Sequence, residues 1–303
     1  MKDRNEIMRF FGLHPQNDVR RRFAFTLAEG ATHVDNSNNK RRFAFTLAEV
    51  LITLGIIGVV AALTIPNLIQ EYQKKQWVAG LQRGYATLNQ VFKTAMAEDM
   101  VDDVTQTELY NAIPIDDEGF RRIHLGSSDY SQFVEQLKKY LKITKVCNPT
   151  DSPLEDSCYG IIYSRLIDGH QRDLDSNEFY WPLNKGRHLK VYTTDGLVYY
   201  FNGLSDNNLS DFGGYLTGSI EIDVNGDAGP NQLGRDLFSF VLLKNGNVIM
   251  PGTKSWDEEV GYFYHWSSED SASGCLLISN ENAYYNGDYC AARIFENGWK
   301  MDY

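Results

Sequence analysis

Glu49 is the residue that most needs a chemical explanation, because it lies inside an otherwise apolar run. The segment 45–66 reads FTLAEVLITLGIIGVVAALTIP, and Glu49 is its single charged residue. A carboxylate within a membrane costs on the order of 3 kcal/mol on insertion scales, so such a residue is usually kept for a function. The chemistry it offers is pairing with a cation at the same depth. The alternative is a carboxylate that reaches the inner membrane interface.

A second candidate for a functional site is a segment rich in Asp and Asn, DVNGDAGPNQLGRD at 223–236. Alternating oxygen side chains resemble the opening of a calcium loop, and the predicted calcium ligands are Asp223, Asn225, Asp227 and Asp236. The glycine, however, follows the second ligand instead of the third, and no Glu stands at the twelfth position of the loop. The alternative is a connection between strands in which Asn, Asp and Gly supply turns.

The four cysteines form two local groups, Cys147 with Cys158 and Cys275 with Cys290. Four cysteines permit three connectivities, and local pairing is the simplest of them. The spacing contains no C-x-x-C motif, which argues against a zinc site or a redox motif. We therefore predict structural disulfides, which suit a compartment outside the cytoplasm.

The sequence shows no pattern of an enzyme. Its six histidines form no H-E-x-x-H motif, and it contains neither G-x-S-x-G nor a phosphate-binding glycine loop. We therefore predict a non-enzymatic protein without a cofactor other than the calcium considered above.

The element that positions Glu49 is the apolar run itself. As a helix it would be roughly 31 Å long, which is enough to cross the hydrocarbon core of a membrane. Lys40, Arg41 and Arg42 precede it, so the N-terminal flank is predicted to stay in the cytoplasm.

These residues resemble a known family. RRFA followed by FTLAEVLITLGIIGVVAALTIPNLI is similar to the cleavage and methylation segment of type IV prepilins and type II secretion pseudopilins. The resemblance implies cleavage by prepilin peptidase between Ala44 and Phe45, with methylation of the new N-terminus. Glu49 then becomes the fifth residue and Pro66 the twenty-second. The chain departs from the family at Ala44, where a glycine is usual.

The resemblance also implies roles in assembly. Glu49 would attract the α-amine of Phe45 on a neighbouring subunit, and the partners would be like or related subunits and an inner-membrane assembly platform. Pro66 removes a helical hydrogen bond and is expected to kink the helix. Gly55 and Gly58 would either loosen the helix ahead of that kink or form a small-residue packing face.

Charge divides the chain into a basic leader and an acidic body. Residues 1–44 carry a net charge of +4 and residues 45–303 carry −15. The motif RRFAFTLAE occurs at 21–29 and again at 41–49, but only the second copy leads into an apolar run. We predict that 1–44 is a leader that is removed. The acidic body argues against nucleic-acid binding.

The helix is predicted to continue beyond the membrane. Apolar residues follow a 3-4-3-4-3 spacing, typical of one buried stripe: Val78, Leu81, Tyr85, Leu88, Phe92 and Ala95. The predicted helix runs from about 46 to 98, with a transmembrane part at 45–66 and an amphipathic part at 67–99.

The remaining residues, 100–303, read as an exported globular α+β domain. A short amphipathic helix is predicted at 127–142 and strands at 159–166 and 218–224. Hairpins are predicted at 190–201 and 237–250, and a C-terminal helix ending at Gly298. Tight turns favour an antiparallel sheet, so the predicted fold is pilin-like: a long N-terminal helix packed on a C-terminal antiparallel sheet.

Two functions follow from these patterns. The first is a structural subunit of a type IV pilus or type II secretion pseudopilus, single-pass in the cytoplasmic membrane, with its body periplasmic or extracellular in a filament. The alternative is a signal-anchored, monomeric adhesin or glycan-binding module outside the cytoplasm. Glu49 distinguishes them, because a simple anchor does not need a carboxylate within the membrane.

Overall fold

The computed structural model describes residues 46–116, 119, 121, 123, 129–148, 188–205, 217–254, 265–267, 274–275 and 287–303. The chain divides into two units, with the boundary between residues 56 and 57. The cleavage residues Ala44 and Phe45 and the predicted strand at 159–166 lie outside the described residues.

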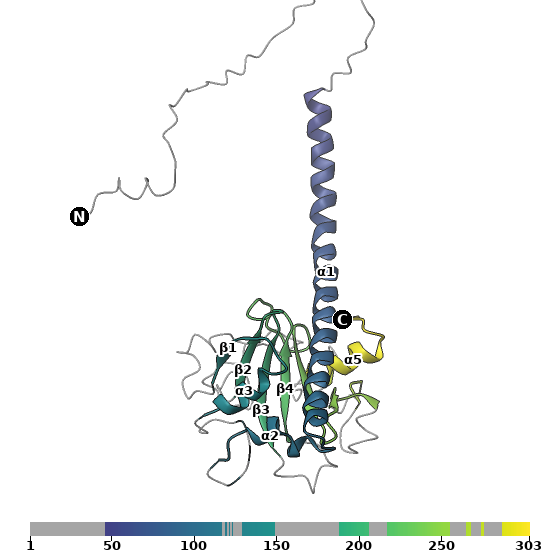
Figure 1. Ribbon diagram of the computed structural model, residues 1–303. Helices are drawn as coiled ribbons and strands as arrows, with labels where there is room; N and C mark the ends of the chain where they lie inside the picture. The colour runs from purple at the N-terminus through teal and green to yellow at the C-terminus, as the bar shows by residue number, and fades with distance from the viewer. Residues whose placement is uncertain are drawn as a thin grey trace, which may run out of the picture. The chain divides into compact units, whose positions relative to one another are not determined.

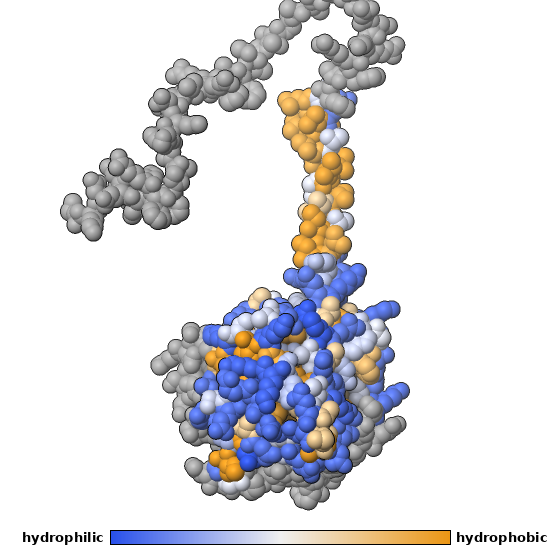
Figure 2. All heavy atoms as spheres, in the orientation of Figure 1, coloured by the Kyte–Doolittle hydropathy of each residue, from blue (hydrophilic) through white to orange (hydrophobic). Residues whose placement is uncertain are grey.

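Helix α1 spans Leu47–Glu98 without interruption (Figure 1). This is the single long helix that the sequence predicts. It passes through Gly55, Gly58 and Pro66, so none of these residues ends it. Its large apolar side chains between Leu47 and Ile69 are exposed, and they give the apolar colour along α1 in Figure 2. By length and composition α1 is able to cross a membrane.

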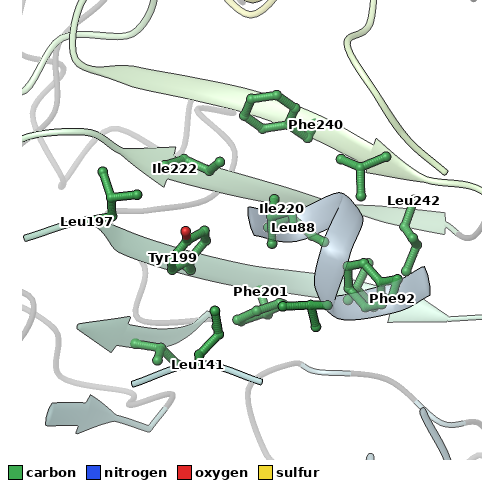
Figure 3. Close-up of a cluster of buried hydrophobic side chains, with 14 of the residues drawn as sticks. Leu88, Phe92, Leu141, Leu197, Tyr199, Phe201, Ile220, Ile222, Phe240 and Leu242 are labelled. Carbon is green, nitrogen blue, oxygen red and sulfur yellow. The ribbon is translucent and has the colours of Figure 1, made fainter. Parts of the chain in front are cut away.

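The second half of α1 buries the stripe that the spacing predicts. Five of its six members are buried and Tyr85 is partly buried; the buried ones are Val78, Leu81, Leu88, Phe92 and Ala95. They belong to one core with apolar residues of the sheet (Figure 3). Burial of this stripe, more than helix propensity, stabilises the aqueous half of a long helix.

The sheet has six strands in the order β1-β2-β3-β4-β5-β6, and every neighbouring pair is antiparallel. The strands are β1 (Ile143–Cys147), β2 (Leu189–Thr193), β3 (Val198–Ser205), β4 (Thr217–Asp223), β5 (Leu237–Leu242) and β6 (Val248–Ile249). The predicted α+β fold, a long helix on an antiparallel sheet, is confirmed.

Both predicted hairpins form at their glycine turns. Gly196 joins β2 to β3 with φ of +83°, and Gly246 joins β5 to β6 with φ of +77°. Glycine adopts this left-handed conformation without the Cβ clash that other residues meet. Residues Ile220 and Ile222 of β4, which pairs with β3 and β5, face α1 in the core (Figure 3).

The short helices flank the sheet. They are η2 (Val104–Gln106), α2 (Glu108–Asn111), α3 (Ser131–Leu137) and α5 (Cys290–Glu296). Helix α3 is shorter than the predicted helix at 127–142, and Phe133 on it packs edge-on against Phe201 of β3. Helix α5 is followed by Gly298 with φ of +68°, as the sequence predicts, and Trp299 then packs near Tyr85 of α1.

Candidate functional site

Glu49 lies in the first turn of α1 and forms a reciprocal cap with Thr46. The backbone N–H and the hydroxyl of Thr46 donate to Glu49 Oε2 at 2.8 Å and 2.9 Å. In return the backbone N–H of Glu49 donates to Thr46 Oγ1 at 3.2 Å. This is a capping box, which satisfies amides that the helix start leaves without intrahelical partners. Within one chain, Glu49 therefore has a local role that the sequence analysis overlooked.

The capping box leaves one carboxylate oxygen of Glu49, Oε1, available for another partner. Both hydrogen bonds from Thr46 end on Oε2, and Oε1 has no hydrogen-bond partner among the described residues. The side chain is exposed, and its neighbours along the helix are exposed and apolar. A cation presented to this helix start could therefore bind Oε1 without breaking the cap.

Gly55 and Gly58 are not required for packing within the chain. Apart from the helix's own backbone, a Cβ at either position would meet no atom of the described residues within 4 Å. Their small size would therefore matter only toward lipid or toward another helix.

A different glycine pair fixes α1 on the sheet. A Cβ at Gly80 would lie 2.7 Å from Val224 Cβ, and one at Gly84 would lie 2.9 Å from Ile222 Cδ1. The two glycines are spaced at i and i+4, on the same face of α1 as the buried stripe. This G-x-x-x-G spacing in the amphipathic half is the signal that could have identified the contact.

Polar side chains of α1 hold both hairpin turns. Arg83 pairs with the Asp195 carboxylate at 3.2 Å, beside the β2–β3 turn. Lys93 donates to the Asn245 carbonyl at 2.7 Å, and Asn89 Oδ1 accepts from the Val248 amide at 3.0 Å. The polar face of α1 therefore positions the turns, while its apolar face fills the core.

The predicted calcium ligands do not converge. Asp236 accepts the amides of Gln232 and Asn231 at 2.6 Å and 2.8 Å, and Asp223 accepts the amide of Asn225 at 3.1 Å. Asp227 instead binds a lysine and a tyrosine of β2. In the part of the chain that the structure describes, no group of three or more His, Cys, Asp or Glu side chains could hold a metal ion. The geometry favours the alternative, a turn-forming connection between β4 and β5.

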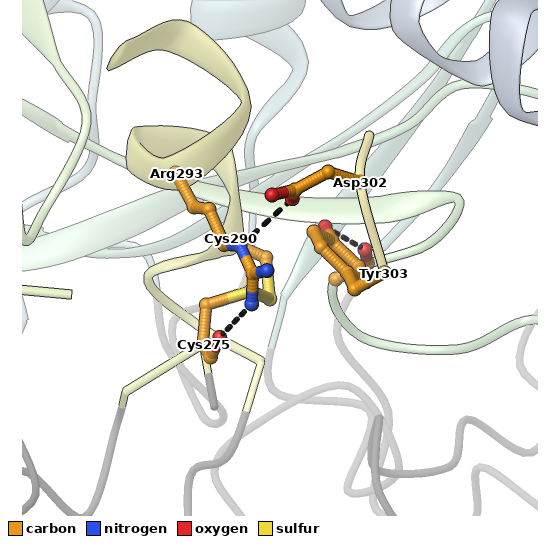
Figure 4. The surroundings of a disulfide bond; sticks show 6 residues. Cys275, Cys290, Arg293, Asp302 and Tyr303 are labelled. Atoms are coloured by element: carbon orange, nitrogen blue, oxygen red, sulfur yellow. Dashed lines mark hydrogen bonds and ion pairs between the residues drawn. A yellow bond between two sulfur atoms is a disulfide. The ribbon is translucent and has the colours of Figure 1, made fainter. Parts of the chain in front are cut away.

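A disulfide joins Cys275 to Cys290 at the start of α5, the pairing that local spacing predicts (Figure 4). Arg293 lies beside it, donates to the Cys275 carbonyl at 2.7 Å and pairs with Asp302 at 2.9 Å. Its guanidinium also stacks over the Tyr303 ring at 4.9 Å. The disulfide and Arg293 thus tie the C-terminal residues to α5.

Cys147, at the end of β1, also takes part in a disulfide. Its predicted partner, Cys158, lies outside the described residues.

A hydrogen-bonded Ser–His–Glu series is present near α5. His265 Nδ1 lies 2.7 Å from Ser267 Oγ, and His265 Nε2 lies 2.8 Å from Glu296 Oε2. Glu296 also accepts the Trp266 indole N–H and the Lys254 amide. Burial acts to raise the pKa of Glu296, but these hydrogen bonds outweigh it and the pKa lies below its usual value. A carboxylate with so many donors serves to hold residues 265–267 on α5.

Two carboxyl groups lie on the sheet face that points away from α1. Glu221 of β4 is buried and accepts a short hydrogen bond from Ser219, while its Oε2 has no hydrogen-bond partner among the residues that the structure describes. It lies opposite Ser239 of β5, whose hydroxyl donates to Asp288 at 3.3 Å. Burial raises the pKa of Glu221 to about 8 and that of Asp288 to about 7. Both shifts favour the protonated form of these carboxyl groups in the native protein.

Two family models match the chain. One, described as "Family of unknown function (DUF6613)", matches residues 67–303, and the other, "Prokaryotic N-terminal methylation motif", matches residues 39–65. The chain belongs to the DUF6613 family. No curated protein and no solved structure gave a significant match.

The methylation motif confirms that the segment before the DUF6613 region is of the prepilin type. The chain is accordingly a type IV pilin-like precursor of the kind that prepilin peptidase processes. The motif points to a structural protein rather than an enzyme. It also indicates a protein anchored in a membrane by α1.

We expect Gly80→Ala to destabilise the DUF6613 region although alanine favours helices by about 1 kcal/mol. The new Cβ would overlap Val224 Cβ, and overpacking of this kind costs about 1–3 kcal/mol. Thermal unfolding of the full-length protein in detergent measures the effect. Gly58→Ala, where a Cβ meets nothing, is the matched control and should not lower the melting temperature. A Gly80→Ala variant as stable as the wild type would contradict the contact.

We expect the stability of the DUF6613 region to fall as pH rises from about 4.5 to about 8. The native pKa values of Glu221 and Asp288 lie above their unfolded values, so the native state binds more protons in this window. Glu221→Gln should reduce that slope and stabilise the protein at pH 8. Unfolding measured across this range is the test, with exposed Glu135→Gln as control. An unchanged slope in Glu221→Gln would refute the assignment.

Proposed function

We propose that the chain is a structural subunit of a type IV pilus or a type II secretion pseudopilus, assembled through its N-terminal helix. The observation that supports this most is the start of α1, where Glu49 precedes a long series of exposed apolar side chains. Such a surface needs a cover of lipid or of other helices. In a filament subunit, lipid covers these side chains before assembly and the helices of neighbouring subunits cover them afterwards.

The proposal divides the chain into four parts. Residues 1–44 are the leader that the peptidase removes, and 45–66 form the transmembrane and assembly helix. Residues 67–99 continue that helix in amphipathic form, and 100–303 form the exported domain. The N-terminus faces the cytoplasm, and the body lies in the periplasm or outside the cell. The Cys275–Cys290 disulfide supports this placement, because disulfides persist in oxidising compartments.

Glu49 gives the proposed filament its axial register. Cleavage frees an α-amine at Phe45, next to the threonine that caps Glu49. An amine from a neighbouring subunit would find Glu49 Oε1 available while Oε2 stays bound to Thr46. Pairing between subunits compensates both charges in lipid, and fixing a register is the best-attested use of a buried ion pair. The inner-membrane assembly platform would bring the subunits to this position.

The mature N-terminus should be Phe45 carrying an N-methyl group. The reason is the RRFA–FTLAE junction at the start of the apolar run. Mass spectrometry of N-terminal peptides from the membrane fraction provides the measurement. A chain that retains its leader, or that starts near Leu63 as after signal-peptidase cleavage, would disprove the processing step.

Glu49→Gln and Glu49→Ala separate the charge of Glu49 from its capping role. Glutamine can keep the capping box with Thr46 but carries no charge, whereas alanine loses both. We expect both variants to insert in the membrane and to be cleaved. We also expect both to enter filaments much less than the wild type, since each lacks the carboxylate. Sheared-filament yield and crosslinking, normalised to membrane level, report the incorporation.

Other results of the incorporation experiment would each exclude a part of the proposal. If Glu49→Gln incorporates normally and Glu49→Ala does not, Glu49 serves the helix cap and the charge-pairing role is wrong. If both incorporate normally, Glu49 has no role in assembly. If the wild type is cleaved but forms no filament, the chain is a monomeric anchored module, such as an adhesin or a glycan-binding protein.

A further inference from the structure

Lys190 of β2 binds Asp227, one of the four residues that the sequence pattern predicts as calcium ligands. Its ammonium lies 3.2 Å from Asp227 Oδ1, inside the 223–236 connection. The lysine side chain is 1% exposed and the Asp227 side chain is 53% exposed, so the cation is covered while its partner reaches the surface. A lysine is almost never this buried unless it is paired.

The surroundings of this ammonium resemble those of a bound cation. Its Nζ lies 4.7 Å from the centre of the Tyr192 ring and 5.3 Å from that of Tyr200, so two aromatic faces contribute cation–π attraction. The Tyr192 hydroxyl donates to both oxygens of Asp227, at 2.8 Å and 3.0 Å. Burial lowers the pKa of Lys190, while Asp227 and Asp223 act in the opposite direction and favour the charged form.

The other carboxylates of the connection are partly engaged by backbone amides. Asp236 accepts two backbone amides, and Asp223 accepts one. Calcium takes six to eight oxygen ligands, mostly carboxylates and carbonyls. An ion added beside Asp227 would meet the ammonium of Lys190, whose positive charge repels it.

We propose that the Lys190 ammonium is the built-in cation of the 223–236 connection and replaces the divalent ion that its sequence pattern predicts. The connection between β4 and β5 is then held by β2 without metal. Removing the ammonium leaves Asp227 and Asp223 without their counter-charge and opens a space beside them, so a divalent ion can enter only in the variant.

The test compares the full-length wild type, Lys190→Ala and Lys190→Met in detergent, each melted in millimolar calcium chloride and in chelator. We expect the wild type to melt at the same temperature in both solutions. Lys190→Ala should melt lower in chelator and regain about 3 °C in calcium. Lys190→Met should melt lower and regain nothing, because methionine fills the space without supplying charge.

Lys145→Ala is the matched control. Lys145 is exposed and lies over the same Tyr192 ring at 5.2 Å, outside the 223–236 connection. Its removal should neither lower the melting temperature as Lys190→Ala does nor produce a calcium response. The proposal is overturned if calcium stabilises the wild type. It is equally overturned if Lys190→Ala melts like the wild type, or if calcium fails to raise its melting temperature.

Discussion

The close contact between α1 and β4 is the constraint on which the rest of the structure depends. Two glycines, Gly80 and Gly84, bring the helix backbone so near to the sheet that a methyl group would not fit between them. At this distance the stripe from Val78 to Ala95 is buried. The polar residues beside the stripe then reach both hairpin turns. A helix held farther away would leave the stripe partly in water and the turns without these partners.

The sheet has two faces of different chemistry. The face toward α1 is apolar, whereas the opposite face carries a row of neighbouring residues across four strands: Lys190, Tyr200, Glu221 and Ser239. Buried polar groups are tolerated when they are paired, and here Asp227, Ser219 and Asp288 provide partners. A slip of one residue would move this row to the apolar face. The polar row therefore disfavours alternative strand registers.

Local signals predicted much of the fold. The stripe on α1 follows from helical spacing, and the two hairpins follow from Asp-Gly and Asn-Gly turns, which need only neighbouring residues. Strand β1 escaped prediction because its residues from Ile143 to Cys147 lack a regular alternation of buried and exposed positions, as an edge strand can. The helix–sheet contact at Gly80 and Gly84 has a local signal in its G-x-x-x-G spacing, but which strand faces it depends on residues far along the chain.

The contacts of the candidate functional residues were less predictable than the fold, for two different reasons. The pairing of Lys190 with Asp227 joins residues far apart in sequence and belongs to no local pattern, so the 223–236 connection alone suggested calcium. Thr46 and Glu49, in contrast, have the spacing of a capping box, which is readable from sequence. Glu49 was interpreted through assembly because it is a carboxylate within an apolar run, whereas its local role in capping the helix was not predicted.

The strand order bears on how the chain can fold. Each described strand after β1 pairs with the strand before it, so a sheet that forms in chain order adds each strand to an edge that already exists. Helix α1, which comes first, offers its apolar stripe to the growing sheet. The Cys275–Cys290 disulfide and the C-terminal tyrosine come last and close over a sheet that is already complete. Among the described strands, none has to wait for a later one before it can pair, which shortens the time that unpaired edges are exposed.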